Sequence, residues 1–202
     1  MLVVAVTGNY GMGKSTVLPM FRRLGAYTID ADEIVGSLLE DNEVIGKIRE
    51  MFGPKVFNPD GGLNKKKIAQ IIFADDTRRA SLENMLHPLV FERVYSIIDR
   101  REEDIIIVEI PLLFEKGYED RVDRTITVYA EVEKAIDRLG KKGIVRHDAI
   151  QRLKTQLPVQ EKIERSDFTI NNSGSLEETQ AQVESIHRRL LKEVRNENSQ
   201  RS

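Results

Sequence analysis

The 202-residue chain contains no cysteine and no tryptophan. Without cysteine, neither a disulfide nor a thiolate metal site can stabilise the fold, so a reducing, cytoplasmic setting is expected. Long apolar runs are also missing. The first covers only about six residues before the chain reaches glycine, and we therefore expect neither a signal peptide nor a membrane-spanning helix. A net charge of only −2 gives no general attraction to nucleic acid or to an anionic membrane.

What is present fits one soluble globular domain with a small insert, because 40% of the residues are hydrophobic and 32% are charged. Short apolar runs alternate with segments of helical period, which predicts an α/β fold whose parallel sheet is covered on both faces. The predicted strands are Leu2–Val6, Tyr27–Ile29, Ile105–Ile110, Thr125–Tyr129 and Phe168–Asn171. The predicted helices span 14–24, 31–39, 77–86, 88–100, 132–139 and 176–194.

The order of these patterns predicts one core with two additions. No strand pattern occurs between Asn42 and Arg100, and this stretch is interrupted only by the turn-forming sequence FNPDGG. We interpret residues 41–100 as a helical insert and residues 1–40 and 101–195 as the core. The polar sequence GKKGIVRHD lies between two helical patterns, which indicates either a mobile lid over about residues 138–150 or an ordinary surface connection.

Three glycines interrupt the first apolar run, at Gly8, Gly11 and Gly13, and Lys14 and Ser15 follow. This spacing fits the phosphate-binding P-loop, G-x-x-x-x-G-K-[ST], at every fixed position, between a strand and an amphipathic helix. Glycine permits positive φ and a close backbone approach, so successive amides can point toward phosphate oxygens at a helix N-terminus. The alternative, a glycine-rich turn that only caps a helix, explains neither the lysine nor the serine.

The P-loop pattern assigns roles to the residues that follow it. Lys14 is expected to reach the β- and γ-phosphates of a nucleoside triphosphate, and the Ser15 hydroxyl to complete the coordination of a Mg²⁺ ion. Thr16 is expected to contact the α-phosphate. Met12 lies inside the same loop and belongs to the predicted nucleotide site.

Acidic residues follow two further strands, and the carboxyl ends of parallel strands share one edge of the sheet. Asp30 and Asp32 come after the second strand, where one carboxylate would cap the next helix and the other would accept a proton or help to hold Mg²⁺. Glu109 ends the third strand as a Walker-B-like acid, and Pro111–Phe114 offer an apolar wall. An acid beside an apolar wall is what a kinase with a small organic acceptor requires.

Other classes of P-loop or phosphate-transferring protein lack support. The guanine-binding Asn-Lys-x-Asp motif of GTPases is missing, as are the His-Arg-Asp and Asp-Phe-Gly motifs of protein kinases. A small-molecule kinase remains. The open alternatives are a kinase for nucleosides or nucleoside monophosphates, and a module that binds ATP as a switch without transferring phosphate.

Several further stretches together resemble the dephospho-coenzyme A kinase family over nearly the whole chain. After the P-loop, the shared stretches are LG at Leu24–Gly25, DAD at Asp30–Asp32, FG at Phe52–Gly53, DGGL at Asp60–Leu63, IIF at Ile71–Phe73, R..LE...HP at Arg79–Pro88, PLLFE at Pro111–Glu115, VD at Val122–Asp123, R...Q at Arg152–Gln156, Lys162 and D.TINNSG at Asp167–Gly174. DAD, HP and PLLFE are more specific than the P-loop alone.

The resemblance implies a three-layer P-loop kinase core with a five-stranded parallel sheet, a helical CoA-binding insert and a lid. It also implies that the γ-phosphoryl group of ATP moves to the ribose 3′-hydroxyl of dephospho-CoA, the last step of coenzyme A synthesis. Asp32 and Lys14 are then the catalytic residues, Asp32 as general base. ATP and dephospho-CoA are the expected partners, with Mg²⁺ as the cofactor, and no nucleic acid, membrane or protein partner is implied.

The same resemblance extends the set of site residues. The ATP site would include Gly8, Gly11, Met12, Gly13, Lys14, Ser15, Thr16, Arg138, Lys142, Arg146 and Asn172. The acceptor site would include Asp32, Lys65, Phe73, His87, Leu112, Phe114 and Glu115. Ser15, Asp32 and Glu109 would hold the metal ion, directly or through water. His87 has an alternative role as a helix-cap or packing residue before Pro88.

The chain departs from the family's usual pattern at a few positions. Asn9, Tyr10 and Met12 occupy variable P-loop positions at which the family usually has glycine, isoleucine and serine. Lys142 replaces the second lid arginine, which keeps the charge but loses the planar bidentate grip on phosphate. We therefore expect lid closure to be weaker, or to be shared with Arg138 and Arg146.

Overall fold

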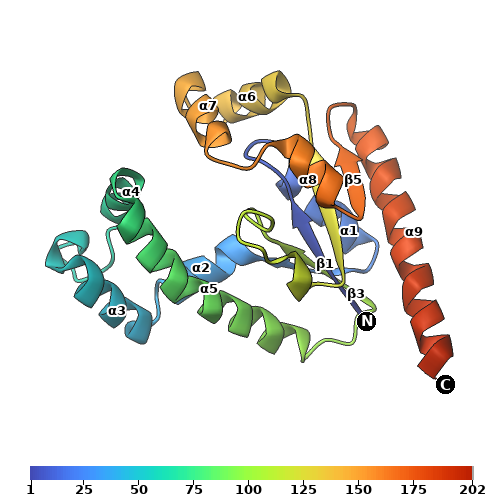
Figure 1. Ribbon diagram of the computed structural model, residues 1–202, viewed down its shortest axis with the longest axis horizontal. Helices are drawn as coiled ribbons and strands as arrows, with labels where there is room; N and C mark the ends of the chain where they lie inside the picture. The colour runs from blue at the N-terminus through green and yellow to red at the C-terminus, as the bar shows by residue number, and fades with distance from the viewer. Residues whose placement is uncertain (202) are drawn as a thin grey trace. The chain divides into compact units, whose positions relative to one another are not determined.

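The computed structural model (Figure 1) describes residues 1–201, apart from the side chains of residues 73, 197, 198, 200 and 201. The chain divides into two compact units. The first consists of Met1–Asp30 and the chain from Glu102 onward, and the second of Ala31–Arg101. The two units are described one after the other.

A five-stranded sheet forms the centre of the first unit, and all its neighbouring strands are parallel. The strands are β1 (Leu2–Thr7), β2 (Tyr27–Asp30), β3 (Ile105–Glu109), β4 (Arg124–Tyr129) and β5 (Phe168–Asn171), in the spatial order β2-β3-β1-β4-β5. The predicted fold class is confirmed, and each predicted strand is present to within one residue at either end. Short runs rich in Val and Ile were sufficient to predict these strands, because strands buried on both faces have nearly continuous apolar sequence.

Two apolar layers cover the sheet. On one face, α1 (Lys14–Arg23) and α9 (Leu176–Arg201) contact each other and pack on the sheet through a cluster that includes Val17, Phe21 and Leu190. A smaller cluster around Ala5, Leu113 and Phe114 contains residues that follow β3. Burial of these side chains gives the three-layer arrangement that the alternating pattern predicted.

A helical hairpin lies beside the loop that follows β1. Its helices α6 (Val132–Lys141) and α7 (Arg146–Lys154) share an apolar cluster with Ile136, Leu139 and Ala149 at its centre. Most of the predicted lid segment is therefore helical, and only residues 142–145 connect the two helices. The short helix α8 (Val159–Arg165), which the sequence patterns did not indicate, follows before β5.

The second unit has its own apolar core. It contains α2 (Ala31–Leu38), α3 (Asn42–Phe52), the 3₁₀ turn Pro54–Val56, α4 (Lys65–Ala74) and α5 (Asp76–Ile98). Ile48, Phe52 and Leu82 lie in the shared cluster. Within the described part of this unit, the only extended pairing is an isolated antiparallel bridge between Phe57 and Leu63, so the expectation of a strandless stretch holds.

Helix α5 differs from the prediction, which placed two helices, over 77–86 and 88–100, on either side of His87. The helix is continuous through Pro88, although proline has no amide to donate and disturbs the preceding turn at a cost of roughly 3 kcal/mol. Leu82 and Leu86 before the proline, and Val90 and Val94 after it, are all buried. Burial on both sides offsets the local cost, because each such side chain contributes about 1.5–3 kcal/mol.

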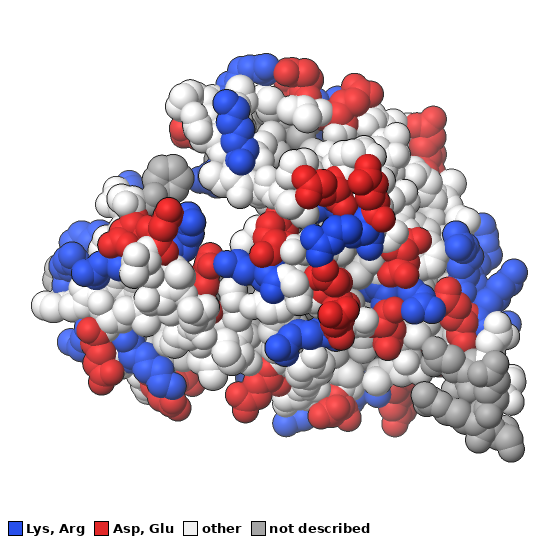
Figure 2. All heavy atoms as spheres, in the orientation of Figure 1, with Lys and Arg blue, Asp and Glu red and all other residues white. Residues whose placement is uncertain are grey.

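The surface shows charges of both signs. Lysines and arginines alternate with aspartates and glutamates over the visible face in Figure 2, as expected for a net charge of −2. No helix in the described chain combines the length and the apolar character that crossing a membrane requires.

Burial of a histidine on α9 leads to a pH-dependent prediction. His187 is only 7% exposed, and burial lowers its pKa from the ordinary value of 6.5. The unfolded chain therefore takes up this proton at higher pH than the folded protein, so stability is lost as the pH falls below about 6.5. We expect Tm to fall less between about pH 7.5 and pH 5 in His187→Gln than in the wild type. The control is His147→Gln, at an exposed position of α7, and equal pH slopes for all three proteins would contradict the prediction.

Candidate functional site

The loop between β1 and α1 is built on glycines with left-handed or extended positive φ. The φ values are 144° at Gly8, 80° at Gly11 and 99° at Gly13. A Cβ at Gly8 would lie 2.2 Å from the Val128 carbonyl oxygen, and one at Gly13 would lie 1.9 Å from Asn172 Nδ2. Both positions thus require glycine for its φ and for the absence of a side chain, and the loop has the conformational requirements expected of a P-loop.

Lys14 begins α1 and turns back toward this loop. Its Nζ donates a hydrogen bond to the Gly8 carbonyl oxygen at 2.9 Å and lies 3.8 Å from Glu109 Oε1. The side chains are 11% and 12% exposed. The ammonium group is therefore held over the loop, where partial removal from water strengthens its interaction with anions.

Oxygen donors suited to Mg²⁺ lie around the same edge of the sheet. Glu109 is the Cα partner of both Val6 and Asp30 in the parallel registers, so two carboxylates end adjacent strands. Ser15 is exposed in the first turn of α1. Mg²⁺ is commonly bound by one or two carboxylates together with phosphate oxygens and water, and this donor set fits that chemistry. Among the described residues, no group of three or more acidic or histidine side chains forms a ready-made metal cage.

Asn172 holds the other side of the loop. Asn172 is only 3% exposed. Its Nδ2 donates to the Met12 carbonyl at 3.0 Å, and its Oδ1 accepts from Thr179 Oγ1 at 3.1 Å. Arg138 Nη2 donates to the Asn172 carbonyl at 2.7 Å. The structure therefore brings together Met12, Gly13, Arg138 and Asn172, all of which the sequence analysis placed in the ATP site.

The other predicted lid cations have different surroundings. Arg146, at the start of α7, forms an ion pair with Glu133 of α6 at 2.9 Å, and both side chains are more than half exposed. Lys142 is exposed at the C-terminal end of α6. Thr16 donates its backbone amide to the Gly13 carbonyl at 2.9 Å, which stabilises the first turn of α1.

Sequence reasoning missed a set of contacts to the two variable P-loop residues. Asn9 Nδ2 donates to the Leu157 carbonyl at 3.0 Å, and the Tyr10 amide donates to Gln156 Oε1 at 2.8 Å. Arg152 Nη1 donates to the Tyr10 hydroxyl at 3.1 Å. Arg152 and Gln156 belong to the R...Q stretch identified in the sequence analysis. That stretch drew attention to these two residues, but it did not indicate that they contact Tyr10.

The PLLFE stretch contributes a buried ion pair in addition to apolar side chains. Glu115 Oε1 lies 2.7 Å from Lys162 Nζ, and the lysine side chain is fully buried. Burial lowers the pKa of Lys162, and Glu115 opposes that shift. Phe114 is only 4% exposed, and Leu112 is partly buried. The predicted acceptor contacts of these three PLLFE residues remain predictions, but the Phe114 ring already lies in an apolar cluster and Glu115 is already paired with Lys162.

In the second unit, an apolar groove brings together two of the predicted acceptor residues. Lys65 and His87 both line a cavity of about 310 Å³. The remaining lining residues are Val35, Leu39, Ile68, Ala69, Ile72, Leu82, Glu83 and Leu86. Asp32 is exposed in the first turn of α2. The Phe73 side chain, also predicted here, lies outside the described side chains.

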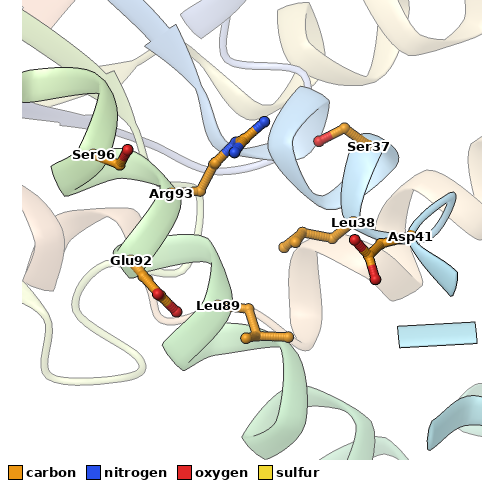
Figure 3. Close-up of a pocket in the computed structure, with 7 residues that line it drawn as sticks. All are labelled: Ser37, Leu38, Asp41, Leu89, Glu92, Arg93 and Ser96. Atoms are coloured by element: carbon orange, nitrogen blue, oxygen red, sulfur yellow. The ribbon is translucent and has the colours of Figure 1, made fainter. Parts of the chain in front are cut away.

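A second groove of about 290 Å³ in this unit lies between α2, the residue before α3, and α5 (Figure 3). Arg93 extends from α5 toward α2 in this view, while Asp41 and Glu92 add negative charge. The groove contains none of the residues that the sequence analysis placed in the acceptor site.

Comparison with known proteins identifies the family. The family model for dephospho-CoA kinase matches residues 2–178. The dephospho-CoA kinase of Aquifex aeolicus is 37% identical over 192 residues, which cover 94% of this chain and 98% of that protein.

Solved structures agree with the sequence comparison. The crystal structure of TT1252 from Thermus thermophilus has a TM-score of 0.83 and 32% identity, and the alignment covers 95% of this chain and 97% of the other. Dephospho-CoA kinase from Campylobacter jejuni has a TM-score of 0.66 and 26% identity, covering 91% and 94%. With a matching P-loop, fold and full-length relatives, the chain belongs to the dephospho-CoA kinase family.

Proposed function

We propose that the protein transfers the γ-phosphoryl group of ATP to the ribose 3′-hydroxyl of dephospho-CoA, giving coenzyme A and ADP. This is the last step of coenzyme A synthesis. The observation that carries the proposal is the Lys14 ammonium group, held between the Gly8 carbonyl and Glu109 at the carboxyl edge of the sheet in a member of this family. The cytoplasm is the proposed compartment, because a chain without cysteine suits a reducing setting.

The P-loop binds the triphosphate. Gly8, Gly11 and Gly13 let the backbone approach the phosphates, and the N-terminus of α1 adds partial positive charge. Lys14 neutralises charge on the transferred group, and Thr16 contacts the α-phosphate. Arg138 is supported as a further phosphate ligand by its position beside Gly13 and Asn172. Lys142 and Arg146 supply additional positive charge from the hairpin.

Mg²⁺ is the proposed cofactor, and its ligands are Ser15, Glu109 and Asp32, directly or through water. When bound, the ion would offset the negative charge of the phosphate groups. The chain's own contribution is to place a hydroxyl and carboxylates near the phosphates. Glu109 also keeps the Lys14 ammonium group over the loop through their 3.8 Å pairing.

The apolar groove of the second unit is the proposed acceptor site. Its aliphatic lining suits the flexible arm of dephospho-CoA, while Lys65 and His87 offer donors to its phosphate or amide oxygens. Phe73, Leu112, Phe114 and Glu115 stay in the proposed acceptor set on the strength of the family pattern. This assignment is separate from the ATP site and can fail independently of it.

Asp32 is the proposed general base. It lies two residues beyond Asp30, whose partner in the sheet is Glu109, and it is exposed at the start of α2. A carboxylate there accepts the proton of the 3′-hydroxyl as the oxygen attacks the γ-phosphorus and the β–γ bridging oxygen leaves with ADP. Positioning of both substrates can lower the barrier by a further amount on the order of 7–11 kcal/mol.

The proposed activity is tested with Mg-ATP and an equimolar panel of dephospho-CoA, nucleosides and nucleoside monophosphates, with products identified by mass spectrometry. We expect only dephospho-CoA to gain one phosphoryl group. Phosphorylation of another panel member alone would move the acceptor assignment to that compound. ATP binding without transfer to any compound would favour the switch module.

The Asp32→Asn variant removes the base while keeping the shape of the side chain. We expect kcat to fall by about 10²–10⁴-fold, with ATP affinity little changed, because the base acts on the acceptor hydroxyl. Glu33→Gln, in the same helical turn, is the matched control and should retain near wild-type turnover. Turnover of Asp32→Asn at the control's level would remove Asp32 from the base role.

The Lys14→Ala variant tests the P-loop. We expect a fall in kcat/KM for ATP of at least about 10²-fold, since a charge that acts on the transferred group is lost. Lys192→Ala, at an exposed position of α9, controls for the loss of one positive charge. Full activity of Lys14→Ala would refute the assignment of this loop, and calorimetric titration with ATP would show whether binding or chemistry was affected.

A further inference from the structure

The two variable residues of the P-loop are tied to a segment that lies far away in the sequence. The Tyr10 backbone amide donates to Gln156 Oε1 across 146 positions, and Asn9 Nδ2, in the side chain, donates to the Leu157 carbonyl. Arg152 adds a hydrogen bond to the Tyr10 hydroxyl, with its guanidinium carbon 5.1 Å from the centre of the Tyr10 ring. Residues 152–157, which we call the support segment, thus contact both the backbone and the side chains of the loop.

The support segment is itself anchored in the core. The Leu157 amide donates to Glu115 Oε1 at 3.1 Å, and Glu115 pairs with the buried Lys162. Lys162 Nζ in turn donates to the Pro111 carbonyl at 3.3 Å. Because a buried ammonium group is costly without its partners, these contacts restrict where the segment can lie.

This chain of contacts returns to the start of the P-loop. Thr7 Oγ1, in the residue before Gly8, donates to the same Pro111 carbonyl that accepts from Lys162, at 3.1 Å. These contacts link Thr7 through Pro111, Lys162, Glu115 and Leu157 to Asn9, and the backbone from Thr7 to Asn9 closes the circuit. A closed circuit constrains the loop at both ends of its first turn.

The circuit has a direct consequence for the loop amides. A P-loop binds phosphate because its amides have fixed directions. A misplacement of about 1 Å can lower the rate about 10²-fold, even when its cause lies far from the reacting atoms. The general motif leaves residues 9 and 10 unspecified, so it does not determine where the Tyr10 amide points. In this chain Gln156 determines it.

We propose that Gln156 is a positioning residue for phosphoryl transfer, which holds the P-loop in its phosphate-binding conformation by accepting the hydrogen bond of the Tyr10 amide. The proposal rests on the proposed function, in that ATP is taken to bind this loop. Gln156 acts through the loop and needs no contact with either substrate.

The test replaces Gln156 by leucine, which keeps side-chain size but removes the acceptor. Gln151→Leu, at an exposed position of α7, is the matched control. We expect kcat/KM for ATP to fall about 10- to 100-fold in Gln156→Leu, while KM for dephospho-CoA stays within about twofold. Gln156→Met, with an unbranched side chain of similar length, replaces the leucine variant if that variant does not fold.

A spectroscopic readout separates positioning from general stability. The chain has five tyrosines, so selective ¹⁵N-tyrosine labelling gives a small set of amide signals. The Tyr10 amide proton should move upfield in Gln156→Leu as its hydrogen bond is lost, with the other tyrosine signals and Tm close to those of the control. An unmoved Tyr10 signal, or a moved signal with unchanged kcat/KM for ATP, overturns the proposal.

The outcome is distinguishable from failure of the proposed function. If the wild type does not phosphorylate dephospho-CoA, the proposed function is wrong. Calorimetric titration of the wild type and Gln156→Leu with Mg-ATP still compares how strongly the two loops bind ATP. Equal ATP affinities in that case overturn the role of Gln156, and a weaker affinity in the variant supports it.

Discussion

The rest of the first unit depends on one steric constraint, the close packing of the glycine loop against its neighbours. The backbone at Gly8 passes so near the Val128 carbonyl that even a methyl group would overlap it, and the backbone at Gly13 is equally close to Asn172. The loop therefore keeps its shape only if β4, the residue after β5 and the helical hairpin keep their positions. The shape, in turn, places the Lys14 ammonium group and the first turn of α1 at the edge of the sheet.

Two lysine–carboxylate pairs near this loop differ in ways that match different tasks. The Lys162–Glu115 pair is tight at 2.7 Å and its lysine is fully buried, so breaking it would leave an unpaired charge in the core. The Lys14–Glu109 pair is separated by 3.8 Å, beyond hydrogen-bond length, and acts mainly through space. A tight pair suits a fixed support, whereas a loose pair suits the role proposed for Lys14, in which the ammonium group also contacts phosphate.

Local patterns predicted the parts of the structure that depend on neighbours in sequence. The strands followed from short Val- and Ile-rich runs, and the loop from glycine spacing. Contacts between residues distant in the sequence had no such signal. The sequence does not indicate that Gln156 accepts a hydrogen bond from Tyr10, or that Lys162 is fully buried. The break predicted at His87, before Pro88, was wrong because burial along α5, which only the folded unit creates, offset the loss of one backbone hydrogen bond.

The unusual residues of this P-loop gain a physical explanation from the same contacts. The Tyr10 ring packs on the apolar cluster shared by α6 and α7, so the hairpin and the loop support each other within one unit. This packing places α6 beside the loop, where Arg138 donates a hydrogen bond to the Asn172 carbonyl next to Gly13. Arg138 thus places near the loop a planar donor group of the kind that Lys142 lacks. If Arg138 binds phosphate as proposed, a lysine at the hairpin's exposed turn is compatible with the proposed ATP site.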